Sequence, residues 1–333
     1  GWQFSFLDNE RTRQYTKLPE NIRIKNLVQL NLLLSPVISK TDRQRFFNHY
    51  SALCYGQTNE DLLGKVINKT RKQIGFMAIA DEHKKHRASV KKQFDDGALF
   101  ESINSTGIHP PYRIKGMMRR DFCGGSATNI ISGIDALLES GSIIKTDRAT
   151  TVSKATVAGQ DVIIKRYNNQ GFLNSLKYTL AGSRARRVWR ETYLLQELDI
   201  ATPTALGYFD VLDKGRVIRS YLLNEFCPEP ILHYLLLDKL IPLDEWPTIV
   251  DLVRELLRDL HGKGVTHGDI KNSNIIYNNG ELILIDLDSL VIHRHSKKLQ
   301  GHIKKDIAAF ERRINSDPEE YIRQKKIELN ISD

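Results

Sequence analysis

The segment from about residue 249 to residue 288 constrains the fold more than any other part of the chain. Apolar residues recur at helical spacing up to Leu260, and two glycines within the next four residues end that pattern. A polar loop follows over residues 267–274. Two short apolar runs then flank a turn at residues 278–280, which reads Asn-Asn-Gly. The sequence therefore predicts a helix, a loop and a β-hairpin with acidic residues at both ends.

Three polar side chains of this segment suit phosphoryl transfer: Asp269, Asn274 and Asp286. That reaction needs groups that hold cations at the nucleotide phosphates and one carboxylate near the acceptor hydroxyl. Because the hairpin folds Asp286 back beside Asn274, we expect the two to share Mg²⁺, which prefers oxygen ligands. Lys271 is expected to reach the transferring phosphate. The alternative is that Asp269 and Asn274 are ordinary turn residues.

The order of these residues resembles the protein-kinase-like superfamily. Its catalytic loop reads His-Arg-Asp, four residues and Asn, followed by a strand pair and Asp-Phe-Gly. Here Gly268 replaces the arginine and Asp288 replaces the final glycine, and no Ala-Pro-Glu follows. These departures resemble small-molecule, sugar and RIO-type kinases more than protein kinases proper. The resemblance makes Asp269 the catalytic base and leaves open whether Asp288 also binds metal.

The resemblance also requires a nucleotide-binding lobe upstream, and residues 142–167 alternate as three strands. Lys165, in the third strand, stands where such proteins place the lysine that binds the α- and β-phosphates of ATP. Glu191, in a helix expected over residues 183–198, is its implied ion-pair partner, with Glu197 as the alternative.

The phosphate-covering loop departs from the superfamily, because the chain has no Gly-x-Gly-x-x-Gly between the first two strands. We expect three hydroxyl groups to donate to phosphate oxygens instead: those of Thr150, Thr151 and Ser153. The strand that leads into Glu225 and Cys227 corresponds to the hinge, so the resemblance implies that backbone groups near these two residues meet adenine.

Further motifs resemble the lipopolysaccharide core kinases, the Kdo and heptose kinase family. They are Lys-Arg-Tyr at 165–167, Arg-Arg-Val-Trp-Arg at 186–190, Ala-Thr-Pro-Thr-Ala at 201–205, the His-Gly-Asp loop, and Lys-Asp-Ile at 305–307. The resemblance covers roughly residues 142–315. It implies ATP- and Mg²⁺-dependent phosphorylation of a lipopolysaccharide inner-core sugar at the cytoplasmic face of the inner membrane. The resemblance also implies that Asp306 supports the catalytic loop. The arginines at positions 184, 186, 187 and 190 are expected to contact a phosphorylated acceptor, or else simply lie on the surface.

The predicted fold class is α+β, a protein-kinase-like fold of two lobes preceded by a helical segment. The kinase-like domain is expected over residues 126–333, with a small antiparallel β N-lobe at about 140–226 and a helical C-lobe at about 227–333. Residues 79–125 are expected to form a basic helical connector. Residues 1–78 resemble the C-lobe tail of a truncated first copy, with Asp8 in the place of Asp286. The alternative is an unrelated helical adaptor.

The net charge of +9 comes from the N-terminal third, where residues 1–125 hold 21 Lys and Arg against 12 Asp and Glu. This excess suits an anionic inner-membrane surface, or else it is a solvated helix face. The basic clusters are not interleaved with aromatic residues, so no nucleic-acid partner is expected. Three widely spaced cysteines and the lack of an apolar span indicate a cytoplasmic protein, peripheral on the membrane if it contacts it.

Two other functions remain open at this point. The chain can be a non-catalytic pseudokinase or scaffold in envelope synthesis, although all four catalytic groups are present. It can also be a RIO-like protein kinase that phosphorylates serine in a partner.

Overall fold

The computed structural model describes residues 13, 15–32, 40–109, 112–124, 127–157, 159–168, 171–293 and 296–329. The chain divides into two compact units, Gly1–Ala78 and Ile79–Asp333. Helix α3, Glu60–Val90, runs through the boundary between them. In the described residues no helix combines the length and the apolar character that a membrane span requires.

The first unit contains α1 (Glu20–Asn31), α2 (Lys40–Tyr55) and the beginning of α3. These helices share a small apolar core made of Leu27, Val28, Phe47, Leu62 and Val66. The predicted likeness of this region to a truncated C-lobe began with residues 4–13 and Asp8, which lie outside the described residues apart from Arg13. It stays a prediction.

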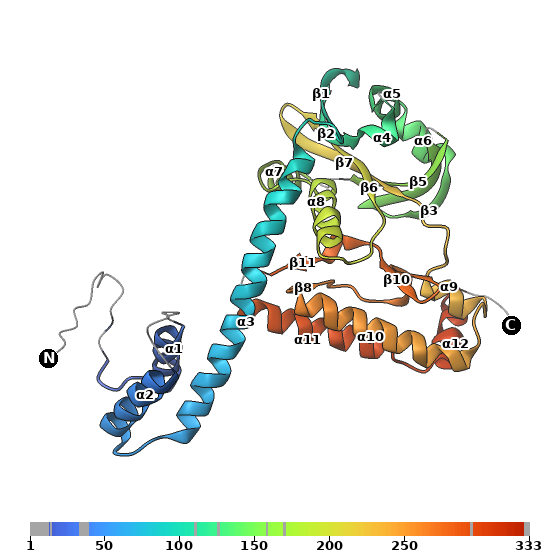
Figure 1. Cartoon of the computed structure of the whole chain (residues 1–333). Coiled ribbons are helices and arrows are strands. Elements are labelled where there is room, and N and C mark those ends of the chain that lie inside the picture. The colour runs from blue at the N-terminus through green and yellow to red at the C-terminus, as the bar shows by residue number, and fades with distance from the viewer. Residues whose placement is uncertain are drawn as a thin grey trace. The chain divides into compact units, whose positions relative to one another are not determined.

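The second unit contains a seven-stranded antiparallel sheet in the order β1-β2-β6-β7-β5-β4-β3 (Figure 1). The strands are β1 (Phe100–His109), β2 (Tyr112–Arg119), β3 (Ser142–Thr146), β4 (Thr150–Val157), β5 (Gln160–Asn168), β6 (Ala205–Asp213) and β7 (Arg216–Glu225). The three strands predicted within residues 142–167 are present as β3, β4 and β5.

Each face of the sheet packs against its own apolar core, because successive side chains of a strand point to opposite faces. On one face Ile164 and Leu223 join the short helices α4 (Arg120–Cys123), α5 (Ala127–Ser132) and α6 (Ile134–Ser140). On the other face Tyr167 and Leu222 share a core with Trp189. Lys165 pairs with Leu222 across β5 and β7 and so lies on this second face.

The prediction of a helical connector over residues 79–125 is wrong for residues 100–119. These residues form the β1–β2 hairpin, which joins the sheet where β2 pairs with β6. Gly116 makes this pairing possible, since a Cβ atom there would lie only 2.1 Å from the carbonyl oxygen of Tyr208. The pairing partner is about ninety residues away along the chain, a contact that local sequence patterns do not reveal.

Two helices connect the strands of the N-lobe, α7 (Phe172–Ala181) and α8 (Arg184–Glu197). Helix α8 begins where predicted: Ser183 caps it by accepting a hydrogen bond from the Arg186 amide at 3.0 Å. Its apolar side, which includes Val188, Trp189 and Leu195, is buried against the sheet.

The C-lobe is mainly helical and lies below the sheet in Figure 1. Its longer helices are α9 (Leu232–Leu237), α10 (Trp246–Gly262), α11 (Ser296–Arg313) and α12 (Pro318–Leu329). Short strands β8 (Val265–Thr266) and β11 (Val291–Ile292) pair with each other, and so do β9 (Ile275–Asn278) and β10 (Glu281–Leu284). Short 3₁₀ turns complete the unit: η2 (Lys91–Phe94), η3 (Leu243–Glu245), η4 (Asn272–Asn274) and η5 (Leu287–Ser289). The predicted α+β arrangement of two lobes is therefore present.

The last part of α3, residues 79–90, contacts both lobes of this second unit. His83 is buried and its ring hydrogen-bonds the carbonyl oxygen of Lys263, just after α10. Ser89 donates to Glu197 at the end of α8 over 2.8 Å, and His86 lies 3.4 Å from the same carboxylate. This helix therefore links the end of α8 to the entrance of the loop at residues 267–274.

Candidate active site

The loop at residues 267–274 is hydrogen-bonded to Asp306 of α11. This fully buried carboxylate accepts the amide of His267 at 2.9 Å and that of Gly268 at 2.8 Å, and His261 lies 3.2 Å away. Burial alone would raise the pKa of Asp306, but these hydrogen bonds hold it below its ordinary value. The predicted support of the loop by Asp306 is confirmed.

Gly268 is required at its position for two reasons. Its φ of +80° lies in the left-handed region, which side chains with a Cβ atom rarely adopt. A Cβ atom would also lie 2.6 Å from the carbonyl oxygen of Ser289. The loop therefore approaches η5 closely, and this close contact explains why no arginine stands before Asp269.

Asp269 is half-buried and forms two ion pairs. Lys271 donates to its Oδ2 at 2.6 Å, and Arg313, the last residue of α11, donates to its Oδ1 at 2.8 Å. Burial opposes ionisation, yet these two cations hold the pKa of Asp269 below its usual range. The carboxylate is therefore ionised and oriented, as a group that accepts a hydrogen bond from a hydroxyl must be. Sequence reasoning missed Arg313, because nothing in its helix marks it.

Asn274 joins the loop to the hairpin. Its side-chain nitrogen donates to the backbone oxygen of Asp269 at 2.9 Å, and its own backbone oxygen accepts from Ile285 at 3.0 Å. The hairpin turn forms as predicted, since Asn279 and Gly280 both have positive φ, 46° and 96°. These contacts place Asn274 beside the residue that precedes Asp286.

Asp286 follows β10 in a left-handed conformation, with φ 58° and ψ 62°. Its Oδ1 accepts a hydrogen bond from Lys165 Nζ at 2.8 Å. Burial would raise the pKa of Asp286, but the Lys165 ammonium outweighs burial and the pKa is lowered. A non-glycine residue in this conformation costs free energy and is a feature of functional sites.

Asp288, whose role sequence reasoning left open, contacts residues of β5 and α8. Its carboxylate accepts from Lys165 Nζ at 2.6 Å, from the Tyr167 hydroxyl at 3.0 Å and from Arg184 at 3.1 Å. Arg187 donates to its backbone oxygen. Through these hydrogen bonds Asp288 connects strand β5 and helix α8 to the segment after β10. Its side chain is only 12% exposed. The sequence signal that could have indicated these contacts is the acidic residue at position 288, where the superfamily motif has glycine.

The predicted pairing of Lys165 with Glu191 is wrong for this structure. Lys165 lies on Asp286 and Asp288, whereas Glu191 lies 3.7 Å from Arg187 and 3.6 Å from Arg190. Burial raises the pKa of Glu191 to about 7. The alternative partner, Glu197, instead contacts His86 and Ser89. Glu191 thus lies beside two arginines of its own helix, and two carboxylates of the C-lobe contact Lys165 instead.

The predicted phosphate-binding hydroxyls are not in a loop. Thr150, Thr151 and Ser153 belong to β4 and are buried. Thr150 pairs with Tyr167 and shares the face of Lys165, but Thr151 and Ser153 pair with Arg166 and Ile164 on the opposite face. The prediction that Thr151 and Ser153 donate to phosphate is therefore wrong, because strand alternation turns them away from Lys165.

The connection between β3 and β4 is a tight turn rather than an open loop. The carboxylate of Asp147 accepts the amides of Ala149 and Thr150, each at 2.8 Å. A glycine-rich loop would direct such amides at phosphate oxygens. Here these two donors are already occupied, so the phosphates would depend more on Lys165 and a metal ion.

Glu225 and Cys227, the residues expected at the hinge, line one cavity of about 470 Å³ together with Gln196, residues 199–203 and Ile283. The Glu225 amide already donates to the Thr204 carbonyl oxygen at 2.9 Å, so it is not available to adenine. Burial raises the pKa of the Cys227 thiol to about 11, which keeps it protonated. The contact of this region with adenine stays a prediction.

The predicted magnesium ligands fit the ion chemically. The side-chain nitrogen of Asn274 is engaged with Asp269, which leaves the amide oxygen for a cation, and Asp286 is ionised. Across the described residues no group of three or more His, Cys, Asp and Glu side chains is arranged to hold a metal. Magnesium at this site would therefore take most of its ligands from phosphate oxygens and water.

Comparison with protein-family models supports the kinase-like fold. Residues 148–306 match the family model of the protein kinase domain. This part of the chain has a protein-kinase-like fold. The matched range contains Lys165, Asp269, Asn274 and Asp286, and a kinase-like domain indicates a phosphotransferase that uses ATP and, as a rule, Mg²⁺. The predicted kinase-like fold is confirmed.

A curated protein to which this chain is similar is the RIO-type serine/threonine-protein kinase Rio1 of Haloferax volcanii. It is 28% identical over 134 residues, which cover 32% of this chain and 46% of that protein. The chain thus spans about half the length of this relative. A solved structure, WaaP in complex with acyl carrier protein, is 18% identical, covers 63% of this chain and 91% of that chain, and has a TM-score of 0.40.

Proposed function

We propose that the protein is an ATP- and Mg²⁺-dependent kinase that phosphorylates a hydroxyl of a lipopolysaccharide inner-core sugar, Kdo or heptose. The observation that carries the kinase assignment is the meeting of Lys165 with Asp286 and Asp288 beside the loop of Asp269. The sugar acceptor is supported by the motifs at residues 165–167, 186–190, 201–205 and 305–307. The same proposal places the protein in the cytoplasm, peripheral on the inner membrane.

The side chains divide the chemistry as follows. Lys165 would bind and orient the phosphates, and Asn274 with Asp286 would hold a magnesium ion that neutralises their charge. Asp269 would accept the hydrogen bond of the acceptor hydroxyl and take its proton as the phosphoryl group moves. Lys271, already 2.6 Å from Asp269, would stabilise charge on the transferring group.

A RIO-like protein kinase is the second candidate. The 28% identity with the Haloferax volcanii kinase favours it, although that match covers 32% of this chain. The two functions share the nucleotide site and differ in the acceptor, so an experiment that identifies the acceptor distinguishes them.

The test is transfer of radiolabelled γ-phosphate from ATP in the presence of Mg²⁺. Separate reactions contain dephosphorylated inner-core lipopolysaccharide or a mixture of unphosphorylated proteins. We expect label in the lipopolysaccharide, abolished by Asp269→Asn and retained by the matched variant Asp244→Asn, which changes an exposed carboxylate. Label in protein alone would favour the RIO-like function. Label unchanged by Asp269→Asn would contradict the assignment of the base.

A further inference from the structure

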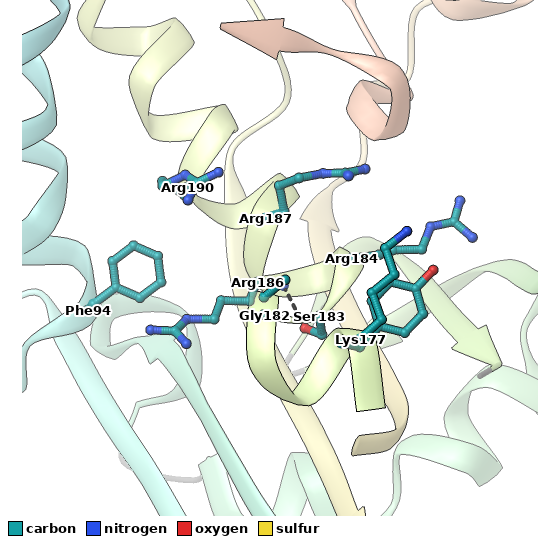
Figure 2. Close-up of a pocket in the computed structure, with 10 residues that line it drawn as sticks. Phe94, Lys177, Gly182, Ser183, Arg184, Arg186, Arg187 and Arg190 are labelled. Carbon is teal, nitrogen blue, oxygen red and sulfur yellow. Dashed lines mark hydrogen bonds between the residues drawn. The ribbon is translucent and has the colours of Figure 1, made fainter. Parts of the chain in front are cut away.

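A cavity of about 510 Å³ lies between α7 and the beginning of α8 (Figure 2). Five cationic side chains line it: Lys177, Arg184, Arg186, Arg187 and Arg190. Among the residues that the structure describes, its lining includes no Asp or Glu. A cavity of this size and charge suits an anionic group carried by a larger molecule.

The cavity adjoins the candidate active site. Arg184 donates to the Asp288 carboxylate at 3.1 Å and Arg187 donates to the Asp288 backbone oxygen. In Figure 2 these two side chains extend to one side of α8, while Arg186 extends toward Phe94, over whose ring it lies at 5.3 Å. An anion in the cavity would thus lie beside Arg184 and Arg187, which contact Asp288, and Asp288 contacts Lys165.

The cations of the cavity are only partly neutralised by their neighbours. Asp288 engages Arg184, Glu191 lies near Arg187 and Arg190, and Asp210 interacts with Arg186. Glu191 binds a proton readily because burial raises its pKa to about 7. The exposed Lys177 on α7 lies over the ring of Tyr178. Positive charge therefore remains for a ligand.

An exposed apolar face of α7 lies beside this cavity. Leu176 is 39% exposed and Leu180 is 80% exposed, and their spacing of four residues puts them on one face of the helix. Each directly precedes a lining residue, Lys177 or Ala181, so the leucines lie about 100° around α7 from the cavity wall. Exposed leucines beside clustered arginines suit a ligand that is both anionic and apolar.

We propose that this surface docks the acceptor: the cavity binds a phosphate group on an amphiphilic lipid, while Leu176 and Leu180 enter the apolar layer beside it. The occupant is a phosphate-bearing lipid, because arginines pair with phosphate oxygens and the leucines remain uncovered. The proposal deepens the proposed function and rests on it for the view that the bound lipid is the acceptor.

The experiment measures flotation of the full chain with vesicles in the absence of nucleotide. Vesicles of phosphatidylcholine with phosphatidic acid are compared with vesicles of phosphatidylcholine alone, and glycerol 3-phosphate serves as a soluble competitor. One variant removes two cavity cations, Lys177→Gln with Arg190→Gln, and another removes the apolar face, Leu176→Gln with Leu180→Gln. The matched controls are Lys298→Gln with Lys304→Gln, and Leu240→Gln, all at exposed positions.

We expect binding only to vesicles that contain phosphatidic acid, weakened about tenfold or more by the cation variant and several-fold by the leucine variant. Both controls should bind as the wild type does, and all variants should unfold cooperatively. If the lysine control lost as much vesicle binding as the cation variant, the binding would reflect general electrostatic attraction to the anionic vesicle, and the proposal would be overturned. Full competition by glycerol 3-phosphate, with no loss in the leucine variant, would show a soluble ligand and also overturn it. Because nucleotide is absent, failure here is distinct from failure of ATP binding or phosphoryl transfer.

Discussion

The Lys165 ammonium lies 2.6 Å from the carboxylate of Asp288, a residue of the segment that follows the β9–β10 hairpin. The lysine of the N-lobe is therefore held by the C-lobe rather than by α8. Helix α8 also contacts Asp288, through Arg184 and Arg187. Asp288 thus connects Lys165, α8 and the segment that contains Asp286.

Replacing Asp288 with Asn tests this connection. The variant keeps the shape of the side chain but removes the charge that Lys165 and Arg184 share, so the free energy of unfolding should fall by about 1–3 kcal/mol. The KM for ATP should rise about tenfold, because Lys165 loses one of its two anchors. Chemical denaturation and steady-state kinetics measure the two effects. Asp244→Asn is the control, and a wild-type KM in Asp288→Asn would contradict the role given to Asp288.

Glu191→Gln should change how stability depends on pH. Burial raises the pKa of Glu191 from 4.5 to about 7, so the folded state binds its proton more tightly than the unfolded state does. The wild type should therefore lose stability as the pH rises from 4.5 to 7, by roughly 3 kcal/mol in total. The Gln variant lacks this loss.

The measurement for Glu191 is the melting temperature of both proteins across this pH range. The Tm of Glu191→Gln relative to that of the wild type should increase with pH and level off above pH 7. A difference that stays constant or shrinks as the pH rises would show that the carboxyl is ionised throughout, as it would be if it were paired with Lys165.

Arg313→Met should shift the acid limb of the pH-rate profile. Burial of Asp269 is outweighed by the two cations that contact it, Lys271 and Arg313, so its pKa is lowered. Removing Arg313 raises that pKa, and protonation then inactivates the base at a higher pH, by roughly one pH unit. The pH dependence of kcat/KM for phosphoryl transfer gives the result, and Arg312→Met at the neighbouring position is the control. An unmoved acid limb would show that Asp269 is not the titrating base.

Gly268→Ala should disrupt the loop of Asp269. At this φ of +80° a methyl group is strained, and it would also meet the Ser289 carbonyl oxygen at 2.6 Å. Gly159→Ala provides a matched control, because Gly159 has the same φ but open space around it. We expect a cost of about 1–3 kcal/mol from strain alone at Gly159 and a larger cost at Gly268, measured by chemical denaturation. Equal costs would mean that the contact with Ser289 does not matter.

Features set by local sequence were predictable. The hairpin of residues 275–284 follows from two apolar runs around Asn279 and Gly280, whose positive φ values the turn requires. Helix α8 follows from a cap at Ser183 and an apolar stripe. The position of Asp306 followed from resemblance, and its two backbone hydrogen bonds explain why a carboxylate is needed there.

Features set by contacts distant in sequence were not predictable. The pairing of β2 with β6 and the ion pair of Arg313 with Asp269 join residues far apart in the chain. The prediction that Thr151 and Ser153 bind phosphate was wrong because both residues lie in a strand and not in a loop. Side chains alternate along a strand, so these two lie on the face opposite Lys165. The partner of Lys165 was not predictable either, because Asp286 and Asp288 lie more than 120 residues away from it along the chain.

The most direct test of the central claim is calorimetric titration of the protein with ATP, with and without Mg²⁺. Wild type should bind ATP at least about tenfold more tightly with Mg²⁺, and Asp286→Asn should lose that gain. Lys165→Met should weaken binding under both conditions, while the exposed control Lys145→Met should not. Equal binding with and without Mg²⁺ in the wild type, or an unchanged gain in Asp286→Asn, would contradict a magnesium–nucleotide site at Lys165, Asn274 and Asp286.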